Sequence, residues 1–134
     1  MKIDHIGIAV RELEQALQVY QVALGLPVAD IVEVPDQQVR VAFLPIGESN
    51  IELVQPSSEA SSTARFIDKR GEGIHHICVQ VDDIDAALAQ LKARGVPLID
   101  QEPRAGAHGR VAFLHPKGTH GVLLELVEHA AERP

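Results

Sequence analysis

The chain of 134 residues has little of what disulfide-rich or membrane-spanning proteins need. Its one cysteine, Cys78, excludes an internal disulfide framework and a zinc finger, and is compatible with a reducing compartment. No apolar run approaches the ~20 residues that cross a bilayer, and the start MKIDHIGIAV lacks the length and the cleavage site of a signal peptide. We therefore expect a soluble, cytoplasmic protein with no membrane partner.

Basic and aromatic residues are also scarce. Twelve lysines and arginines stand against nineteen acidic residues, the formal net charge is -7, and aromatic residues make up 3% of the chain. Nucleic acid is disfavoured as a partner because its binding usually needs a basic surface and often aromatic stacking platforms. An anionic small molecule stays compatible, since it needs only a local group of cations. The length suits one domain that buries roughly two-thirds of its unfolded surface.

The first half of the chain has the pattern of one strand, one helix and three strands. Residues 3–10 alternate as a strand, with His5, Gly7 and Ala9 on the face opposite the aliphatic residues. Apolar residues at helical spacing predict a helix over 11–24, ended by Gly25 and Pro27. Strands follow at 28–34, 39–44 and 50–55, with turns at 35–38 and 47–49. Residues 1–56 thus form a predicted βαβββ module.

The second half repeats this order. Residues 57–72 are a polar connection with a short helix at 64–70, and residues 73–128 form a second βαβββ module. Its predicted elements are a strand at 74–81, a helix at 84–94, and strands near 98–102, 110–114 and 121–128. Residues 129–134 are predicted to be a tail.

The two modules can be aligned by constant offsets. His5 and His76 differ by 71 positions, RVAFL at 40–44 recurs at 110–114, and ELV at 52–54 recurs at 125–127. Several matches in one order favour an internal duplication. The fold class predicted is α+β, with two tandem βαβββ modules forming a cupped mixed sheet around a metal site.

Four residues are the candidate metal ligands. Pairing of the modules about a pseudo-two-fold axis would bring His5 towards His76 and Glu52 towards Glu125. Two imidazoles and two carboxylates suit a divalent ion such as Co²⁺, Mn²⁺, Zn²⁺, Ni²⁺ or Fe²⁺, and a cation would offset the cost of burying two carboxylates together. The alternative is that the histidines are structural and the glutamates face solvent. His75, His108, His115, His120 and His129 have no symmetric counterpart and are interpreted as surface or pocket-rim residues.

Over nearly its whole length the sequence resembles the methylmalonyl-CoA epimerase family of the vicinal oxygen chelate superfamily. The segments that carry the resemblance are IDHIGIAV, FLPIG, IELVQP, ARFIDKRGEGIHHICVQVDDIDAAL, GVPLID and VAFLHPKGTHGVLLELVE. The resemblance implies paired βαβββ modules around one divalent metal, commonly in a homodimer, with the family's ligand motif falling on His5, Glu52, His76 and Glu125. It further implies Co²⁺ as the first candidate, ahead of Mn²⁺, Zn²⁺, Ni²⁺ or Mg²⁺.

The reaction that the resemblance implies is inversion at C2 of methylmalonyl-CoA, between its S and R forms, through an enolate. Inversion needs two acid/base groups, because the proton leaves one face of C2 and returns to the other. Glu125 is the candidate for one. Some members carry the second as a glutamate at a position that Val41 occupies here. Asp36 is our candidate in its place, with Glu33, a bound water or another side chain as alternatives.

The CoA phosphates would need cations, and we expect Lys117 and Arg104 to contact the substrate, with Arg110 and Arg70 as further loop cations. Two other functions stay open at this point. The first is a glyoxalase-like metal isomerase acting on a thiol adduct, and the second is a metal-free module that binds a small molecule.

Overall fold

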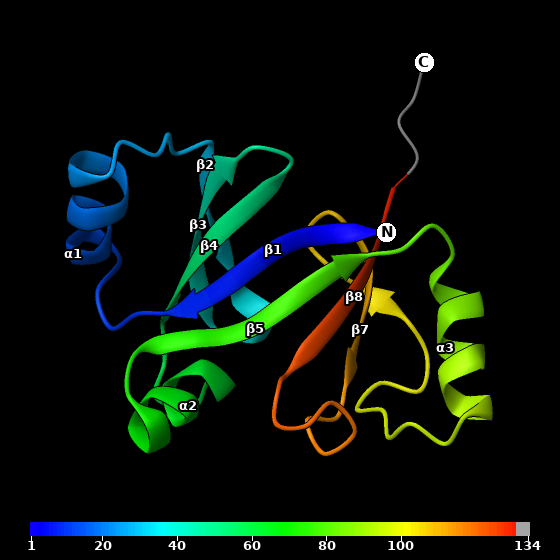
Figure 1. Ribbon diagram of the computed structural model, residues 1–134. Coiled ribbons are helices and arrows are strands. Elements are labelled where there is room, and N and C mark those ends of the chain that lie inside the picture. Colours follow the sequence, from blue (N-terminus) through cyan, green and yellow to red (C-terminus); the bar gives the residue numbers. More distant parts are fainter. Residues whose placement is uncertain (131–134) are drawn as a thin grey trace. The chain divides into compact units, whose positions relative to one another are not determined.

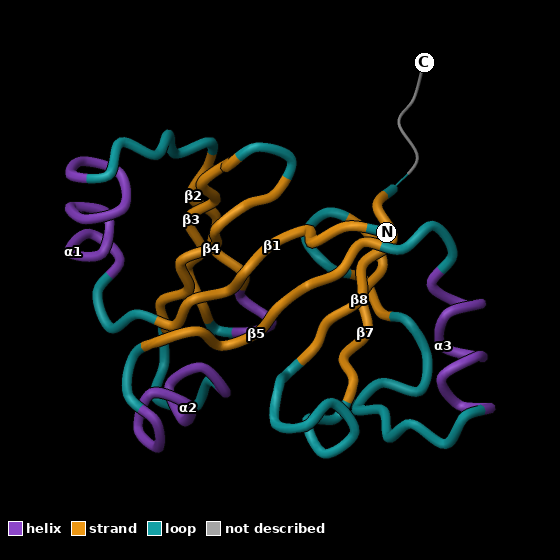
Figure 2. Tube along the Cα trace, in the orientation of Figure 1, coloured by secondary structure: helices purple, strands orange, loops and turns teal. Residues whose placement is uncertain are grey.

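The computed structural model describes residues 1–130, which fall into two compact units. The N-terminal unit is His5–His75, and the C-terminal unit combines Met1–Asp4 with the chain from His76 onward. Both are α+β, with helices and strands interspersed along the chain (Figures 1 and 2). Among the described residues, no helix has both the length and the apolar character that crossing a membrane would require.

The N-terminal unit is a four-stranded mixed sheet in the order β2-β3-β4-β1. β1 runs parallel to β4, and the other neighbours are antiparallel. The elements in chain order are β1 (Lys2–Ala9), whose first three residues belong to the other unit, α1 (Leu13–Leu17), η1 (Gln18–Ala23), β2 (Asp30–Val34), η2 (Pro35–Gln37), β3 (Val39–Ile46), β4 (Ser49–Pro56) and α2 (Ser62–Arg70).

The C-terminal unit repeats this arrangement in the order β5-β8-β7-β6, with β5 parallel to β8 and the other pairs antiparallel. Its elements are β5 (Gly73–Gln80), whose first three residues belong to the other unit, α3 (Ile84–Ala93), β6 (Arg104–Ala105), β7 (Gly109–Leu114) and β8 (Leu124–His129). The predicted βαβββ order is therefore present twice.

Each unit buries one helix against one face of its sheet. The core beneath α1 and the core beneath α3 contain six buried residues each, and the two sets match one to one through the offsets of the duplication. They are Val10, Leu13, Leu17, Ala42, Leu44 and Leu53 in the N-terminal unit, and Val81, Ile84, Leu88, Ala112, Leu114 and Leu126 in the C-terminal unit. Because this face is closed by the helix, the opposite face is the one that can carry polar functional groups.

The closing strand of each module also anchors the start of its helix. The first backbone N–H of α1, at Leu13, donates to Oε1 of Gln55 at 2.7 Å, and the first of α3, at Ile84, donates to Oε1 of Glu128 at 3.0 Å. Such N–H groups have no partner within the helix, so an acceptor on a neighbouring strand satisfies them. The two contacts are equivalent in the duplication.

Charged pairs repeat in the same way on the helix face. Arg40 on β3 binds Glu14 on α1 at 3.0 Å, and Arg110 on β7 binds Asp85 on α3 at 2.5 Å. The pKa of Glu14 is lowered, first by a hydrogen bond from its own backbone N–H and then by the Arg40 side chain.

Four elements differ from the sequence-based expectation. The helix predicted over 11–24 is α-helical only to Leu17 and continues with wider turns, in which Leu24 N–H donates to the carbonyl of Val19 five residues earlier. β2 begins at Asp30, two residues later than predicted. The strand predicted near 98–102 is a loop with one bridge, Leu98 to Leu114, and its strand pairing comes later, at β6.

The fourth difference is at the last strand. β8 begins at Leu124, because residues before it form turns in which His120 and Gly121 adopt positive φ angles of 58° and 96°. β8 ends at His129, which the sequence assigns to a tail, and residues 131–134 of that tail lie outside the described residues.

Candidate functional site

In the N-terminal unit, His5 and Glu52 form a close pair on the face away from α1. β1 and β4 are parallel with Gly7 opposite Glu52, so His5 and Glu52 point to the same side of the sheet. His5 Nδ1 lies 2.8 Å from Glu52 Oε2, and the side chains are 10% and 13% exposed. A histidine and a carboxylate are thus held together where water has little access.

The C-terminal unit holds the equivalent pair, His76 and Glu125. Cys78 on β5 stands opposite Glu125 on β8, as Gly7 stands opposite Glu52 in the other unit. His76 Nε2 lies 3.2 Å from Glu125 Oε1, with side-chain exposures of 10% and 11%. The duplication therefore reproduces the chemical pair as well as the strands that position it.

A third residue lines this face in both units. Phe43 on β3 is opposite Glu52, and Phe113 on β7 is opposite Glu125. The Phe113 ring packs edge to face against the His76 ring, with centroids 5.8 Å apart and planes at 75°. Each His/Glu pair, defined here as His5 with Glu52 or His76 with Glu125, is thus bordered by an aromatic ring position.

Asp36, predicted as an acid/base group, lies apart from the His5/Glu52 pair. It is exposed in η2, the turn between β2 and β3. The β3–β4 register places Val39, just after this turn, opposite Pro56, which is four residues or about 13 Å along β4 from Glu52. Glu33 is no nearer, because it pairs with Arg40 on the face that α1 covers.

Two of the predicted loop cations are engaged with neighbours in their own unit. Arg110 binds Asp85, and Arg70 lies over the Phe66 ring at 6.0 Å. Lys117 is exposed in the turn after β7, where its backbone N–H donates to Nδ1 of His115 at 3.0 Å. Arg104 is on β6, opposite Val111, and so on the same face as Glu125.

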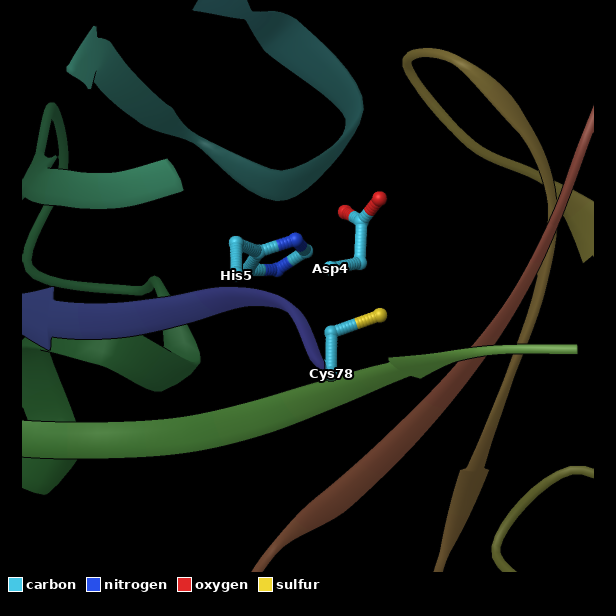
Figure 3. Close-up of side chains that lie close together, drawn as sticks. All are labelled: Asp4, His5 and Cys78. Atoms are coloured by element: carbon cyan, nitrogen blue, oxygen red, sulfur yellow. The ribbon is translucent and has the colours of Figure 1, made fainter. Parts of the chain in front are cut away.

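The structure reveals a further polar pair in the C-terminal unit that the sequence did not predict. His129 Nε2 lies 2.5 Å from Oδ1 of Asp4. The sulfur of Cys78 lies within 4.8 Å of an Asp4 carboxylate oxygen (Figure 3). Because His129 is bound to Asp4, we interpret this carboxylate as a structural partner of β8. Its signal in the sequence was weak, since the two residues are 125 positions apart.

The donor atoms of the two His/Glu pairs fit a divalent metal ion. Imidazole nitrogens and carboxylate oxygens are the ligands that first-row transition ions and Zn²⁺ take in proteins. In each unit these atoms are close together and nearly inaccessible to water. A buried carboxylate is costly unless a cation or hydrogen bonds compensate it, so the pairs suit a positive charge.

Comparison with known proteins agrees with this chemistry. Residues 4–113 match the model of the Glyoxalase/Bleomycin resistance protein/Dioxygenase superfamily. The ethylmalonyl-CoA/methylmalonyl-CoA epimerase of Cereibacter sphaeroides is 43% identical over 128 residues, which span 93% of this chain and 96% of that protein. The mitochondrial methylmalonyl-CoA epimerase of Homo sapiens is 41% identical over 127 residues, spanning 93% and 72%. The chain belongs to the methylmalonyl-CoA epimerase family.

A solved structure extends this relation to the methylmalonyl-CoA epimerase family's ligand. The structure of methylmalonyl-CoA epimerase in complex with methylmalonyl-CoA and NH4+ has a TM-score of 0.91 and is 41% identical, covering 99% of this chain and 98% of that one. The α+β vicinal oxygen chelate fold and the family inferred from the sequence are thereby confirmed. Members of this superfamily use a divalent metal, and the chemistry of the His/Glu pairs fits one.

Proposed function

We propose that the chain inverts C2 of methylmalonyl-CoA with Glu52 and Glu125 as its two acid/base groups, beside a divalent ion held by both His/Glu pairs. The activity itself, that of an isomerase acting on an acyl-CoA, follows from the family. One observation carries the assignment of residues: a buried histidine next to a glutamate with little exposure recurs in the same register in both units.

Because the C2 hydrogen of the substrate is acidic, two carboxyl groups are sufficient as the acid/base groups of the inversion. C2 of methylmalonyl-CoA lies between a thioester and a carboxylate, so its hydrogen is unusually acidic for a C–H group and its loss leaves an enolate. A carboxylate next to C2 takes the proton, and a carboxylic acid on the other side returns one, which inverts the centre. Each turnover leaves the two groups with exchanged protonation states, and proton exchange with solvent restores them before the next turnover in the same direction.

Glu52 takes the second role by elimination within the N-terminal unit. Every other acidic side chain from His5 to His75 is exposed, whereas Glu52 is 13% exposed and beside His5. The position of the missing family glutamate, Val41, is on the same face but is packed in an apolar cluster with Val39, Phe43 and Val54. Asp36, the weaker candidate from the sequence, is exposed in η2, just before Val39, which lies opposite Pro56 and not opposite Glu52.

The residues that would hold the ion are His5, Glu52, His76 and Glu125. When bound, a divalent ion would supply positive charge to the substrate oxygens as C2 loses its proton. Co²⁺ is the first candidate on the family resemblance, and Mn²⁺, Zn²⁺, Ni²⁺ and Mg²⁺ are to be compared with it. The histidines provide nitrogen ligands, which favour the transition ions over Mg²⁺.

The activity is tested by exchange of solvent deuterium into C2 during inversion of (S)- or (R)-methylmalonyl-CoA. Metal-loaded protein should invert either form with incorporation of deuterium. Protein that is metal-loaded and folded but yields neither inversion nor exchange would remove the proposed function. This assay also separates an epimerase from the glyoxalase-like isomerase and from the metal-free binding module considered above.

The metal site is tested separately by metal content. His76→Ala should lower the bound Co²⁺ after dialysis, because it removes one nitrogen ligand. His75→Ala is the matched control: its ring is the next one along β5 and packs against Phe66, with centroids 4.9 Å apart. Equal metal content in wild type and His76→Ala would contradict the assignment.

Assembly and location are proposals of a different kind. We expect a homodimer in the cytoplasm, as the family resemblance and the composition indicate. Light scattering on the purified protein measures the oligomeric state, and a dilution series that gives monomer at every concentration would rule out the homodimer.

A further inference from the structure

The edge strands of the two units differ on the face that carries the His/Glu pairs. In the N-terminal unit β2 pairs with β3 over five residue pairs, and the residue opposite Val41 is Val32. In the C-terminal unit β6 pairs with β7 over two, and the residue opposite Val111, the counterpart of Val41, is Arg104. A cation therefore replaces an apolar residue at one point of the duplication.

The Arg104 guanidinium is held in place by two neighbours. Its Nε lies 3.5 Å from Oδ1 of Asp100, and its Cζ lies 5.5 Å from the centre of the Phe113 ring. The other oxygen of Asp100 accepts the backbone N–H of Phe113 at 2.8 Å, which ties the carboxylate to β7. The cation over the ring adds a stabilising interaction that is strongest where water is excluded.

Phe113 links this cation to the His76/Glu125 pair. Its ring meets the His76 ring on one side, and the Arg104 guanidinium lies over it. Arg104 is thus one side chain away from His76, on the same face of the same unit. The Arg104 side chain is 48% exposed, whereas Asp100 is 18% exposed, so the cation is the more accessible member of the pair.

The contact with Asp100 is made at Nε. The guanidinium carries two further, terminal nitrogens, both hydrogen-bond donors. Those nitrogens form the planar fork that binds a carboxylate through two parallel hydrogen bonds. Two anions of an acyl-CoA could meet this fork, the carboxylate of the acyl group and the phosphates of CoA. The carboxylate is bonded directly to C2, whereas the whole pantetheine arm separates the phosphates from it. The position next to His76 favours the carboxylate.

We propose that Arg104 is the specificity-determining residue that binds the free carboxylate of the acyl group, so that the site selects malonyl-type thioesters over uncharged acyl-CoAs. This rests on the proposed function, which places the reacting C2 beside the His/Glu pairs. Arg104 has an apolar residue as its counterpart in the N-terminal unit. The group that it would bind, the free carboxylate, is what distinguishes methylmalonyl-CoA from propionyl-CoA.

The test compares equilibrium binding of malonyl-CoA and propionyl-CoA, which differ by that carboxylate, to metal-loaded wild type, Arg104→Gln and Arg104→Lys by calorimetry. Arg104→Gln should weaken the binding of malonyl-CoA about 10- to 100-fold, as expected for loss of a charge-assisted hydrogen bond. The affinity for propionyl-CoA should stay within about twofold of wild type. Arg104→Lys should fall between, since it keeps the charge and loses the fork. Arg94→Gln, an exposed arginine that follows α3 in the same unit, is the matched control and should change neither.

Two results would overturn the proposal. Equal weakening of both ligands in Arg104→Gln would assign the residue to the CoA phosphates, and unchanged binding of malonyl-CoA would remove it from the site. Arg104→Lys guards against a folding defect, because lysine keeps the positive charge and the flexible side chain and removes only the planar guanidinium. Failure of the proposed function appears elsewhere, as absence of C2 exchange in the wild type, and leaves the binding comparison measurable.

Discussion

Replacing Glu52 by glutamine should leave proton transfer at only one of the two faces of C2. The amide cannot take or return a proton, so only Glu125 still acts on C2. In deuterium oxide the variant should replace the C2 hydrogen of one enantiomer by deuterium without inverting it. The other enantiomer should keep its hydrogen. Glu125→Gln should show the complementary preference, because the two glutamates occupy equivalent positions in the two units.

The size of the effect follows from the surroundings of Glu52. Loss of one acid/base group lowers inversion by about 10²- to 10⁴-fold, equivalent to about 3 to 5 kcal/mol of barrier. The fold should tolerate the change, because glutamine has nearly the same volume and keeps an oxygen for the His5 contact, now 2.8 Å long and 13% exposed on the Glu52 side. We expect a loss of no more than about 2 kcal/mol in the free energy of unfolding, from a charged to a neutral hydrogen bond.

Proton NMR of each enantiomer in deuterium oxide measures exchange and inversion together, and metal analysis of the same samples checks the ligands. Glutamine offers a carbonyl oxygen, so Glu52→Gln should retain most of the ion. Inversion at the wild-type rate would refute the role of Glu52. Loss of exchange from both enantiomers in a folded, metal-loaded variant would refute it equally, because a lone Glu125 should still act on one face.

Two further predictions concern the duplicated framework. Leu53→Ala and Leu126→Ala remove equivalent core side chains, 0% and 6% exposed, and each should lower the free energy of unfolding by about 2 to 5 kcal/mol in urea denaturation; a loss below about 1 kcal/mol at either site would contradict the packing. Glu14→Gln should flatten the acid limb of the stability profile slightly: the pKa of Glu14 is lowered in the folded state, so its contribution is present above its unfolded pKa and lost as pH falls through the folded one. Glu12→Gln is the control, and an unchanged acid limb in Glu14→Gln would show that neither the backbone hydrogen bond of Glu14 nor its Arg40 pair contributes to stability.

The order of elements and the helix-covered cores could be predicted because two independent signals agreed. Apolar periodicity marked the faces, and the offsets matched residues such as Leu17 and Leu88 across the two modules. The wider turns after Leu17 could not be predicted in this way. A change from four-residue to five-residue hydrogen bonding moves the backbone without changing which residue types stand at which spacing.

The candidate site divides along the same line. The offsets selected His5, Glu52, His76 and Glu125, but the pairing of each histidine with the glutamate of its own unit depends on the parallel registers of β1 with β4 and β5 with β8. Their role as metal ligands stays a prediction. The place of Arg104 over Phe113 could not be predicted. The strand that the periodicity indicated near 98–102 is a loop in the structure, and β6, which carries Arg104, is too short to show a pattern of its own.

The contacts that anchor α1 and α3 have a consequence for how the chain acquires its structure. Each helix begins at an N–H group whose acceptor lies on the last strand of the module, 42 residues later in one case and 44 in the other. During synthesis at about 5 to 20 residues per second, the helix therefore waits for seconds before its acceptor exists. The hydrogen bond that anchors each helix can form only when the final strand of its module has been made. The unit of folding is then the entire βαβββ module, and the glutamate on that final strand is put in place by the same event.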